Sequence, residues 1–297
     1  MAVVLFFREK EMKIVIYFIS VLLSVSIYFS DGFRAYREIS TTWQDNILTK
    51  YANYDPHDQY FSKCNLLSGT IGHYDKTCIN ERETDIFLWG DSHAAALSPG
   101  LREKFSDKII SQITTSGCRI SFGKDDVDTF RSKQCSRSNH IAFNAIREIG
   151  PQVVIIAQEK EHSLIDLNYL VSSLESFGVK KLVIVGPVPQ WRPSLPLAVV
   201  QFNEKPTYLV SKYFDRKIDK ENNLMREKVS LFRKNKKMEV EYIDLISHFC
   251  RSGASNDEDY KCNVWTTPER NDLIIFDYGH LTQQGSKYAV KLLLDDN

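Results

Sequence analysis

The sequence predicts an α/β protein: a flavodoxin-like, three-layer α/β/α sandwich whose sheet is mainly parallel and has about five strands. Two observations support this fold class. From residue 84 onwards, short apolar runs alternate with longer stretches that suit helices, and such alternation is typical of a doubly wound sheet. Most of the runs are almost continuous in Val, Ile and other apolar residues, as in parallel strands that are buried on both faces.

The predicted strands and helices follow one another in order along the chain. The strands are expected at residues 86–89, 109–113, 153–157, 182–185 and 240–245. The helices are expected at residues 94–105, 137–149, 163–177, about 205–236 and 282–293. In such sheets the site lies at the carboxyl ends of the strands. Residues 90–92 directly follow the first strand and residues 116–118 lie just beyond the second, so we expect both segments at the site.

A proline-rich segment follows the fourth predicted strand. Pro187, Pro189, Pro193 and Pro196 lie close together in the sequence. Proline fixes φ and has no N–H to donate, so this density predicts a rigid extended loop rather than a helix. We expect the loop either to form a wall of the site or to be only a long crossover connection.

An apolar segment near the N-terminus predicts a membrane helix. Residues 14–29 contain no charged side chain, and the run is only slightly shorter than the ~20 residues that a membrane span needs. An uncleaved anchor is the first expectation, and a cleaved signal peptide or a buried core helix are the alternatives. The predicted organisation is therefore an anchor or signal at 1–30, a linker and cap extension at 31–83, and the main domain at 84–297.

Charge and motif content argue against several classes of ligand. The chain has 38 Lys and Arg and 38 Asp and Glu, so its formal net charge is zero, and it has no long basic tract of the kind that nucleic-acid binding needs. The seven histidines are scattered without metal-ligand spacing, and there is no dinucleotide or phosphate-binding glycine motif. We expect no nucleic-acid partner, no metal and no other cofactor.

The cysteines indicate an oxidising compartment. An even number of cysteines beside an export or membrane signal is typical of disulfide-bonded proteins, although free thiols in a reducing compartment are the alternative. Six cysteines can pair in many ways, and sequence alone does not choose among them. Pairing sequence neighbours is the simplest solution because each bond would close one short loop. It gives Cys64–Cys78, Cys118–Cys135 and Cys250–Cys262.

Two short motifs supply the parts of a serine nucleophile. Ser92 lies in Gly-Asp-Ser-His directly after an apolar run, and Asp277-x-x-His280 lies near the C-terminus. A serine at a strand-to-helix turn, an imidazole base and a carboxylate that orients it are the components of nucleophilic catalysis. Asp277 and His280 are three residues apart, and residues with this spacing share a face on one helical turn, so we expect the two side chains to touch. His93 follows the serine directly, so we expect it to be structural or a local hydrogen-bond partner, and not the base. We expect Asp91 to cap the following helix or to brace the turn.

These motifs resemble those of the SGNH (GDSL-like) hydrolase superfamily. More closely, the chain is similar to the SGNH domain that is fused to, or works with, membrane acyltransferases of the acyltransferase-three family. The resemblance is carried by residues 87–93, 115–118, 186–189 and 277–281, and it covers most of residues 30–293. Residues 30–34 also look like the end of the last membrane helix and the linker in those enzymes.

The resemblance implies a role for each site residue. Ser92 would be the nucleophile, His280 the base and Asp277 the group that orients the imidazole. The backbone N–H groups of Ser92 and Gly117 would form the oxyanion hole. The superfamily's third block adds an Asn side chain, but this chain has none at the end of the third strand, where Gln158 is the candidate replacement.

The resemblance also implies a function, because those enzymes O-acetylate bacterial surface polysaccharides. We expect transfer of an acyl group, acetyl first of all, to a glycan such as lipopolysaccharide. A multispanning membrane acyltransferase would be the partner that supplies the acyl group. The catalytic domain would lie on the periplasmic side of the bacterial inner membrane. Two alternatives stay open: a carbohydrate esterase with the same triad, and a non-catalytic glycan-binding domain with a vestigial triad.

Overall fold

The computed structural model describes residues 17–26, 42–56, 61–67, 72–122, 130–232, 238–251 and 261–294. The chain divides into two compact units, residues 1–49 and 50–297. Of the predicted membrane helix at 14–29, residues 17–26 are described and are helical, and the rest lies outside the described residues. Within the described ranges, no helix combines the length and apolar character that crossing a membrane requires.

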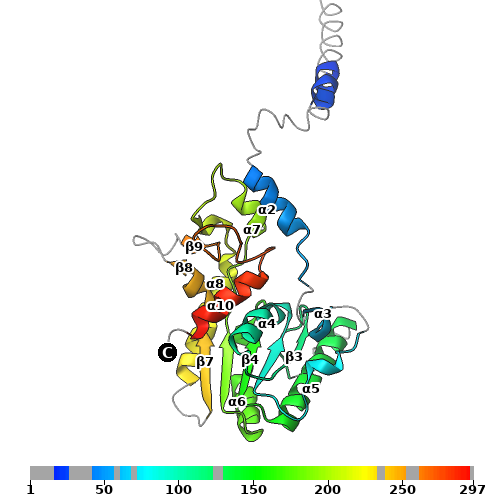
Figure 1. Cartoon of the computed structure of the whole chain (residues 1–297), viewed down its shortest axis with the longest axis vertical. Coiled ribbons are helices and arrows are strands. Elements are labelled where there is room, and N and C mark those ends of the chain that lie inside the picture. The colour runs from blue at the N-terminus through cyan, green and yellow to red at the C-terminus, as the bar shows by residue number, and fades with distance from the viewer. Residues whose placement is uncertain are drawn as a thin grey trace, which may run out of the picture. The chain divides into compact units, whose positions relative to one another are not determined.

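The second unit is built around a six-stranded sheet, shown in Figure 1. All neighbouring strands in it are parallel, and their order is β1-β3-β2-β4-β5-β7. Without β1, this is the 2-1-3-4-5 order of flavodoxin-like sheets. The strands are β1 (Asn65–Leu66), β2 (Ile86–Gly90), β3 (Ile110–Thr115), β4 (Val153–Ala157), β5 (Lys181–Val185) and β7 (Glu239–Ile243).

The predicted α/β fold class is confirmed, with one strand more than expected. β1 lies within the segment predicted as linker and cap, and it pairs with β3 through Asn65 and Thr114. A strand of two residues is too short to produce a period in the sequence. Part of that segment therefore belongs to the edge of the central sheet.

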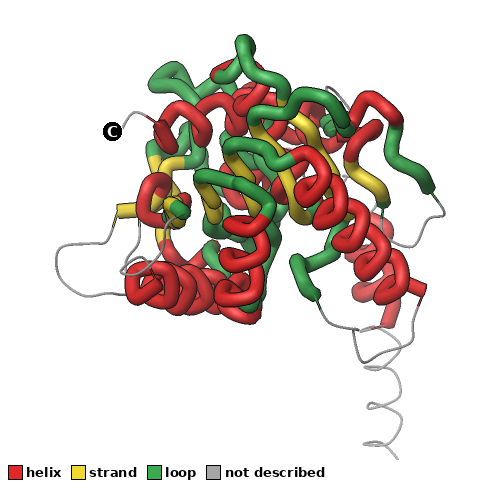
Figure 2. The backbone as a smooth tube through the Cα atoms, turned by 90° about the horizontal axis from the view of Figure 1, so that it is seen from below, coloured by secondary structure: helices red, strands yellow, loops and turns green. Residues whose placement is uncertain are grey.

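Helices lie on both faces of the sheet, and Figure 2 shows the strands between them. On one face, alternate strand residues such as Trp89 and Ile156 pack with Ile146, Leu170 and Val229. These come from α5 (Phe130–Ile149), α6 (Leu167–Ser176) and α8 (Arg216–Phe232). On the other face, α4 (Ser92–Lys104) contacts β2 and β3 and packs against α10 (Gln283–Leu294).

The long helix predicted at 205–236 is wrong in its first third. That part forms the short strand β6 (Tyr208–Val210) and the 3-10 turn η4 (Ser211–Tyr213). β6 pairs with β9, and α8 begins only after Asp215, whose carboxylate accepts the N–H of Lys217. The helix predicted at 163–177 likewise begins with the 3-10 turn η3 (His162–Leu164), because Asp166 caps α6 at the N–H of Tyr169.

The proline-rich segment is extended up to Ser194, but the prediction of no helix is wrong at its end. A short helix, α7 (Leu195–Val199), includes Pro196 in its first turn. There the missing N–H of proline costs nothing, because the first N–H groups of a helix have no intrahelical acceptor. The segment is anchored beside the second motif, since Trp191 N–H donates to Tyr278 O and Leu195 N–H to Asp277 O, both at 2.8 Å.

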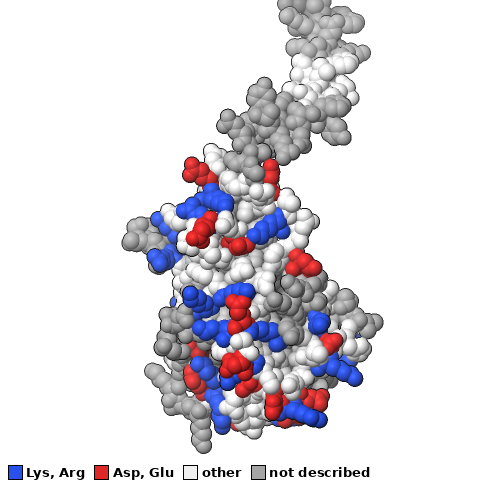
Figure 3. Space-filling model, in the orientation of Figure 1, with Lys and Arg blue, Asp and Glu red and all other residues white. Residues whose placement is uncertain are grey.

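Smaller elements complete the described part of the chain. A second sheet has the strand order β6-β9-β8. Its strands pair antiparallel, whereas those of the main sheet are parallel. Basic and acidic side chains are interspersed over the face shown in Figure 3. The remaining elements are α2 (Thr42–Ala52), α3 (Phe61–Cys64), η2 (Lys76–Cys78), α9 (Leu245–Phe249), β8 (Cys250–Arg251) and β9 (Lys261–Asn263).

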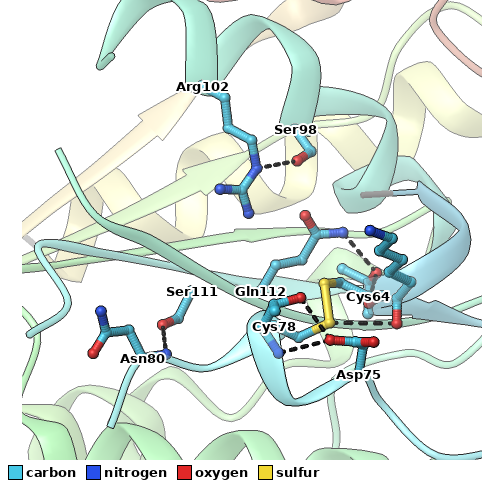
Figure 4. The surroundings of a disulfide bond; sticks show 11 residues. Cys64, Asp75, Cys78, Asn80, Ser98, Arg102, Ser111 and Gln112 are labelled. Atoms are coloured by element: carbon cyan, nitrogen blue, oxygen red, sulfur yellow. Dashed lines mark hydrogen bonds between the residues drawn. A yellow bond between two sulfur atoms is a disulfide. The ribbon is translucent and has the colours of Figure 1, made fainter. Parts of the chain in front are cut away.

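All three predicted disulfides are confirmed. The bonds join Cys64 to Cys78, Cys118 to Cys135, and Cys250 to Cys262. Figure 4 shows the first of them beside Gln112 of β3. The carbonyl of Cys64 accepts a hydrogen bond of 2.8 Å from the Thr114 hydroxyl, so this disulfide lies at the β1–β3 edge of the sheet.

Candidate active site

Gly90 ends β2 at a point where no other residue fits. Its φ is +152°, and a Cβ at this position would lie 1.8 Å from the carbonyl oxygen of Ala157 in β4. A side chain is excluded by that contact as well as by the backbone conformation. The close approach of the two strand ends lets the chain turn at once, so that Ser92 becomes the first residue of α4.

Asp91 fixes this turn from inside the protein. One carboxylate oxygen accepts the N–H of His93 and the other accepts the N–H of Glu159, both at 2.8 Å. The predicted capping role is therefore confirmed, and Asp91 also ties the turn to the loop after β4. Burial raises the pKa of Asp91 to about 7, even though both backbone hydrogen bonds lower it.

Ser92, His280 and Asp277 form one hydrogen-bonded chain. Ser92 Oγ lies 2.8 Å from His280 Nε2, and His280 Nδ1 lies 2.7 Å from Asp277 Oδ2. A carboxylate only accepts hydrogen bonds, so Nδ1 carries the proton and Nε2 accepts from the serine hydroxyl. The structure thus brings together, from opposite ends of the domain sequence, the three residues predicted as nucleophile, base and orienting carboxylate.

Asp277 and His280 meet in a bend and not on a helical turn, because α10 begins only at Gln283. Asp277 Oδ1 accepts the N–H of Gly279 at 2.8 Å and of His280 at 2.7 Å, which folds the chain back on itself. Burial raises the pKa of Asp277, but hydrogen bonds and attraction from His280 outweigh it and hold the pKa below its usual value. The carboxylate therefore stays ionised.

The His93 ring packs against the ring of His280. Its centroid lies 4.5 Å from that of His280. Gly279 makes room for it, since a Cβ there would lie 3.1 Å from His93 Cε1. Burial, followed by the charges of His280 and His162, holds the pKa of His93 well below its usual value. A neutral ring can thus lie beside an imidazole that becomes charged during a reaction.

The residues predicted for an oxyanion hole follow three neighbouring strands: Ser92 follows β2, Gly117 follows β3 and Gln158 follows β4. The N–H of Ser92 is at the start of α4 and so has no intrahelical acceptor. Gly117 follows β3 in a turn closed by Cys118 N–H and Thr115 O at 3.0 Å, and its φ of +65° suits the third position of a type II turn. Both residues thus follow the carboxyl ends of two neighbouring strands.

Gln158 follows β4, and its side-chain amide holds two loops together. Gln158 Oε1 accepts the N–H of Ile120 at 3.0 Å, and Nε2 donates to the carbonyl of Lys160 at 2.6 Å. One N–H of the amide is therefore already used by the protein. Whatever Gln158 adds to an oxyanion hole must come from the second N–H of that amide.

The described part of the chain also contains a cavity away from Ser92, but no candidate metal site. No group of three or more His, Cys, Asp or Glu side chains there could hold a metal ion. A cavity of about 370 Å³ lies between α4 and the sheet, with Leu97, Leu101, Ile155 and Val183 among its mainly apolar walls. It lies away from the Ser92–His280–Asp277 chain, which does not line it.

Sequence reasoning missed Glu159 and Gln190 as neighbours of the site. The carbonyl of Glu159 accepts a hydrogen bond of 3.1 Å from Gln190 Nε2, so the loop after β4 is joined to the proline-rich segment. The one signal that could have pointed to Glu159 is its place two residues after the end of a predicted strand. Gln190 has no such signal, because it lies in a loop whose path depends on packing.

Comparisons with known proteins agree with this arrangement. The family model described as "SGNH domain (fused to AT3 domains)" matches residues 62–295. No curated protein matches the chain. Among solved structures, the periplasmic domain of the lipopolysaccharide acetyltransferase of Salmonella ser. Paratyphi A is similar, with a TM-score of 0.59 and 22% identity over 82% of this chain and 97% of that one. At this identity the likeness concerns the fold, whereas the match over residues 62–295 shows that the chain belongs to the SGNH domain family of the type fused to AT3 domains.

Proposed function

We propose that this enzyme transfers an acyl group, acetyl first of all, to a hydroxyl of a cell-surface polysaccharide through an acyl-serine at Ser92. Its family makes it an enzyme of the acyl-transfer or esterase kind. The observation that carries the proposal is the continuous chain from Ser92 Oγ through His280 to Asp277, with links of 2.8 Å and 2.7 Å. These are the distances at which a base can take a proton from a nucleophile.

The first half of the reaction would form the acyl-enzyme. Ser92 Oγ attacks the carbonyl carbon of the acyl donor while its proton passes to His280 Nε2. Asp277 stabilises the imidazolium through the Nδ1–H hydrogen bond. The tetrahedral intermediate then collapses, the bond to the leaving group breaks, and that group takes the proton from Nε2. The acyl ester of Ser92 and neutral His280 remain.

The second half would pass the acyl group on. A hydroxyl of the acceptor gives its proton to His280 Nε2 as its oxygen attacks the carbonyl of acyl-Ser92. The intermediate collapses, the bond to Oγ breaks, and Oγ takes the proton back from Nε2. The products are the acylated acceptor and the free enzyme, with no net change in protons or electrons.

The oxyanion of both intermediates would be held by the N–H groups of Ser92 and Gly117, with Gln158 as a third candidate. The first lies at the N-terminus of α4, where the helix dipole favours negative charge. Loss of one such donor typically costs ~10²–10³ in rate. Since Gln158 already donates to Lys160 O, we expect its contribution to be the smallest of the three.

The acceptor, partner and compartment are part of the same proposal. The solved relative is named as the periplasmic domain of a lipopolysaccharide acetyltransferase, and the family is described as fused to AT3 domains. These descriptions support a glycan acceptor, a multispanning membrane acyltransferase as acyl supplier, and a place on the periplasmic side of the inner membrane. The apolar segment 14–29 would be the anchor, and three disulfides fit an oxidising compartment.

The proposal is tested by comparing wild type with Ser92→Ala. Release of nitrophenol from nitrophenyl acetate should fall by several orders of magnitude, because a triad without its nucleophile retains little activity. Ser172→Ala is a matched control, since the Ser172 hydroxyl bonds only within α6. Residual activity of Ser92→Ala within about tenfold of wild type would exclude Ser92 as the nucleophile.

Plain hydrolysis is the second candidate, because the site is partly open to water. The Asp277 side chain is 32% exposed and that of His280 is 14% exposed. The two functions differ in what reaches acyl-Ser92. Wild-type enzyme given an acetyl ester and a panel of bacterial glycans should yield O-acetylated sugar by mass spectrometry. Free acetate alone, even with the membrane partner present, would favour the esterase.

A further inference from the structure

Tyr278 and Glu159 lie near the Ser92–His280–Asp277 chain but have no part in the mechanism proposed above. Tyr278 lies between Asp277 and His280 in the sequence and is 36% exposed. Its ring stands edge-on to that of His280, with the centroids 5.3 Å apart and the planes at 80°. The backbone behind it is fixed, since its carbonyl accepts the N–H of Trp191. Tyr278 is therefore a held, solvent-facing aromatic ring next to the base.

Glu159 reaches the same place from the loop after β4. Its backbone is held on both sides, by Asp91 at its N–H and by Gln190 at its carbonyl. Its side chain remains 24% exposed, with Oε1 at 3.6 Å from Lys160 Nζ. Burial, and then the charges of Glu159, Asp277 and Asp91, raise the pKa of Tyr278. The phenol therefore stays protonated in the field of these carboxylates.

Together these groups have the chemistry of a sugar-binding site. Carbohydrate sites combine a flat aromatic ring, against which the C–H face of a pyranose packs, with a fixed carboxylate that accepts hydrogen bonds from hydroxyls. A fixed negative charge also disfavours an anionic group at the same point. The donor's acyl group needs none of these features, whereas a neutral, hydroxyl-rich acceptor needs both.

We infer that Tyr278 and Glu159 form the acceptor subsite, which binds one neutral pyranose unit of the glycan and directs one of its hydroxyls to His280 Nε2. This inference rests on the proposed function. The competing explanation is that Tyr278 and Glu159 only brace His280. The two explanations differ in kinetics, because a brace acts on both half-reactions and an acceptor subsite acts on the second alone.

The test uses Glu159→Gln and Tyr278→Leu in the full chain, the second because leucine keeps much of the bulk of tyrosine but has no flat ring. Tyr208→Leu is the matched control, because Tyr208 is similarly exposed at 43% but stands beside Lys261 in the small sheet. Acyl-enzyme formation is followed by the nitrophenol burst from nitrophenyl acetate. Acceptor use is followed as the ratio of acetylated sugar to free acetate over a concentration series of methyl hexosides and methyl deoxyhexosides.

Both variants should raise the KM for the sugar about tenfold or more. Glu159→Gln removes a hydrogen bond to a charged group, and Tyr278→Leu removes the flat ring against which the sugar packs. The transfer-to-hydrolysis ratio should fall as the KM rises, and Tyr208→Leu should leave both quantities as in wild type. An equal fall in the burst rate and in transfer would show that the residues brace His280 and would overturn the inference. An unchanged KM for the sugar would overturn it too.

Binding separates this inference from the proposed function. If wild type releases only free acetate, transfer itself is refuted, and saturation-transfer NMR of the methyl glycosides with Ser92→Ala then decides. Binding that is lost in Ser92→Ala/Tyr278→Leu and Ser92→Ala/Glu159→Gln supports the subsite. Absence of binding to Ser92→Ala, or equal binding to all three proteins, overturns it.

Discussion

At the scale of single residues, Asp277 does two things with one carboxylate. Its Oδ1 accepts the N–H of Gly279 and of His280, which places the base, and its Oδ2 accepts His280 Nδ1–H, which sets the tautomer. The sequence spacing predicted the contact between Asp277 and His280 but not its cause, because the helical turn that would align them is absent. Glu159 could not be assigned from sequence, since its position depends on Asp91 and on packing.

Asp277→Asn should therefore leave the fold in place and remove most of the activity. If the amide oxygen keeps the two backbone N–H groups, its NH₂ faces Nδ1 and favours the wrong tautomer of His280. A change of this kind costs ~10⁴ in kcat where it has been measured in a serine triad. Steady-state hydrolysis of nitrophenyl acetate measures it, and near-ultraviolet circular dichroism checks the fold. A loss below tenfold would mean that Asp277 does not set the tautomer.

At the scale of elements, the structure depends on how closely the strand ends approach each other. The five long strands were predictable because short runs rich in Val and Ile are typical of parallel strands that are buried on both faces. β1 and β6 were not, because two or three residues show no period and each owes its strand conformation to its partner, β3 or β9. α7 was missed because Pro196 argues against a helix everywhere except in the first turn.

Gly90→Ala should be strongly destabilising. The new Cβ would lie 1.8 Å from Ala157 O, so β2 and β4 must separate at their ends. Backbone strain and overpacking together should cost about 2 kcal/mol or more in free energy of unfolding. Gly178→Ala is the control, because Gly178 also has a positive φ, +89°, but its Cβ would meet nothing within 4 Å. Equal losses in urea unfolding for both variants would refute the close approach.

Removal of the Cys64–Cys78 bond should weaken the β1 edge first. The disulfide closes a loop with a sequence separation of 14, and chain entropy assigns about 3 kcal/mol to a loop of this size. Cys64→Ala/Cys78→Ala should therefore lower the unfolding free energy, and amides of residues 65–66 should lose hydrogen-exchange protection before those of β4. Unchanged protection at 65–66 would show that β3 alone holds the edge.

At the scale of the whole molecule, the fold class followed from the alternation of strands and helices, and the order of the long strands is the flavodoxin-like one. The two catalytic motifs meet because β2 is central, with β3 and β4 on either side, and α10 returns along α4. That return needs long-range packing, which no local pattern encodes. The chemistry of the two motifs and their resemblance to known SGNH domains linked the two ends of the chain beforehand.

Buried histidines should each make the domain less stable in acid. Burial lowers the pKa of His162 to about 4, although a hydrogen bond to Val185 O raises it. In the unfolded chain a histidine protonates near pH 6.5, so between pH 6.5 and about 4 the unfolded state binds more protons at this residue, and the contribution of His162 to stability falls as pH falls. The slope of this contribution is up to about 1.4 kcal/mol per pH unit. His93 acts in the same direction, whereas Asp91, whose pKa is raised to about 7, acts against both.

His162→Gln should reduce that slope, because glutamine can still donate to Val185 O but does not titrate. His248→Gln, at an exposed position on α9, should leave the slope as in wild type. Urea unfolding at a series of pH values between 7 and 4 measures both. A wild-type slope that His162→Gln does not change would mean that His162 is not kept neutral by the fold.

The central claim is that Ser92 carries the acyl group, and isolation of the acyl-enzyme tests it most directly. Enzyme mixed with nitrophenyl acetate and quenched in acid during the burst is digested, and the peptides are analysed by mass spectrometry. The account predicts one acetyl group on the peptide that contains Ser92, located on Ser92 by fragmentation and lost when a sugar acceptor is added before the quench. Turnover without any acetyl on Ser92, or with the acetyl on another side chain, would contradict it.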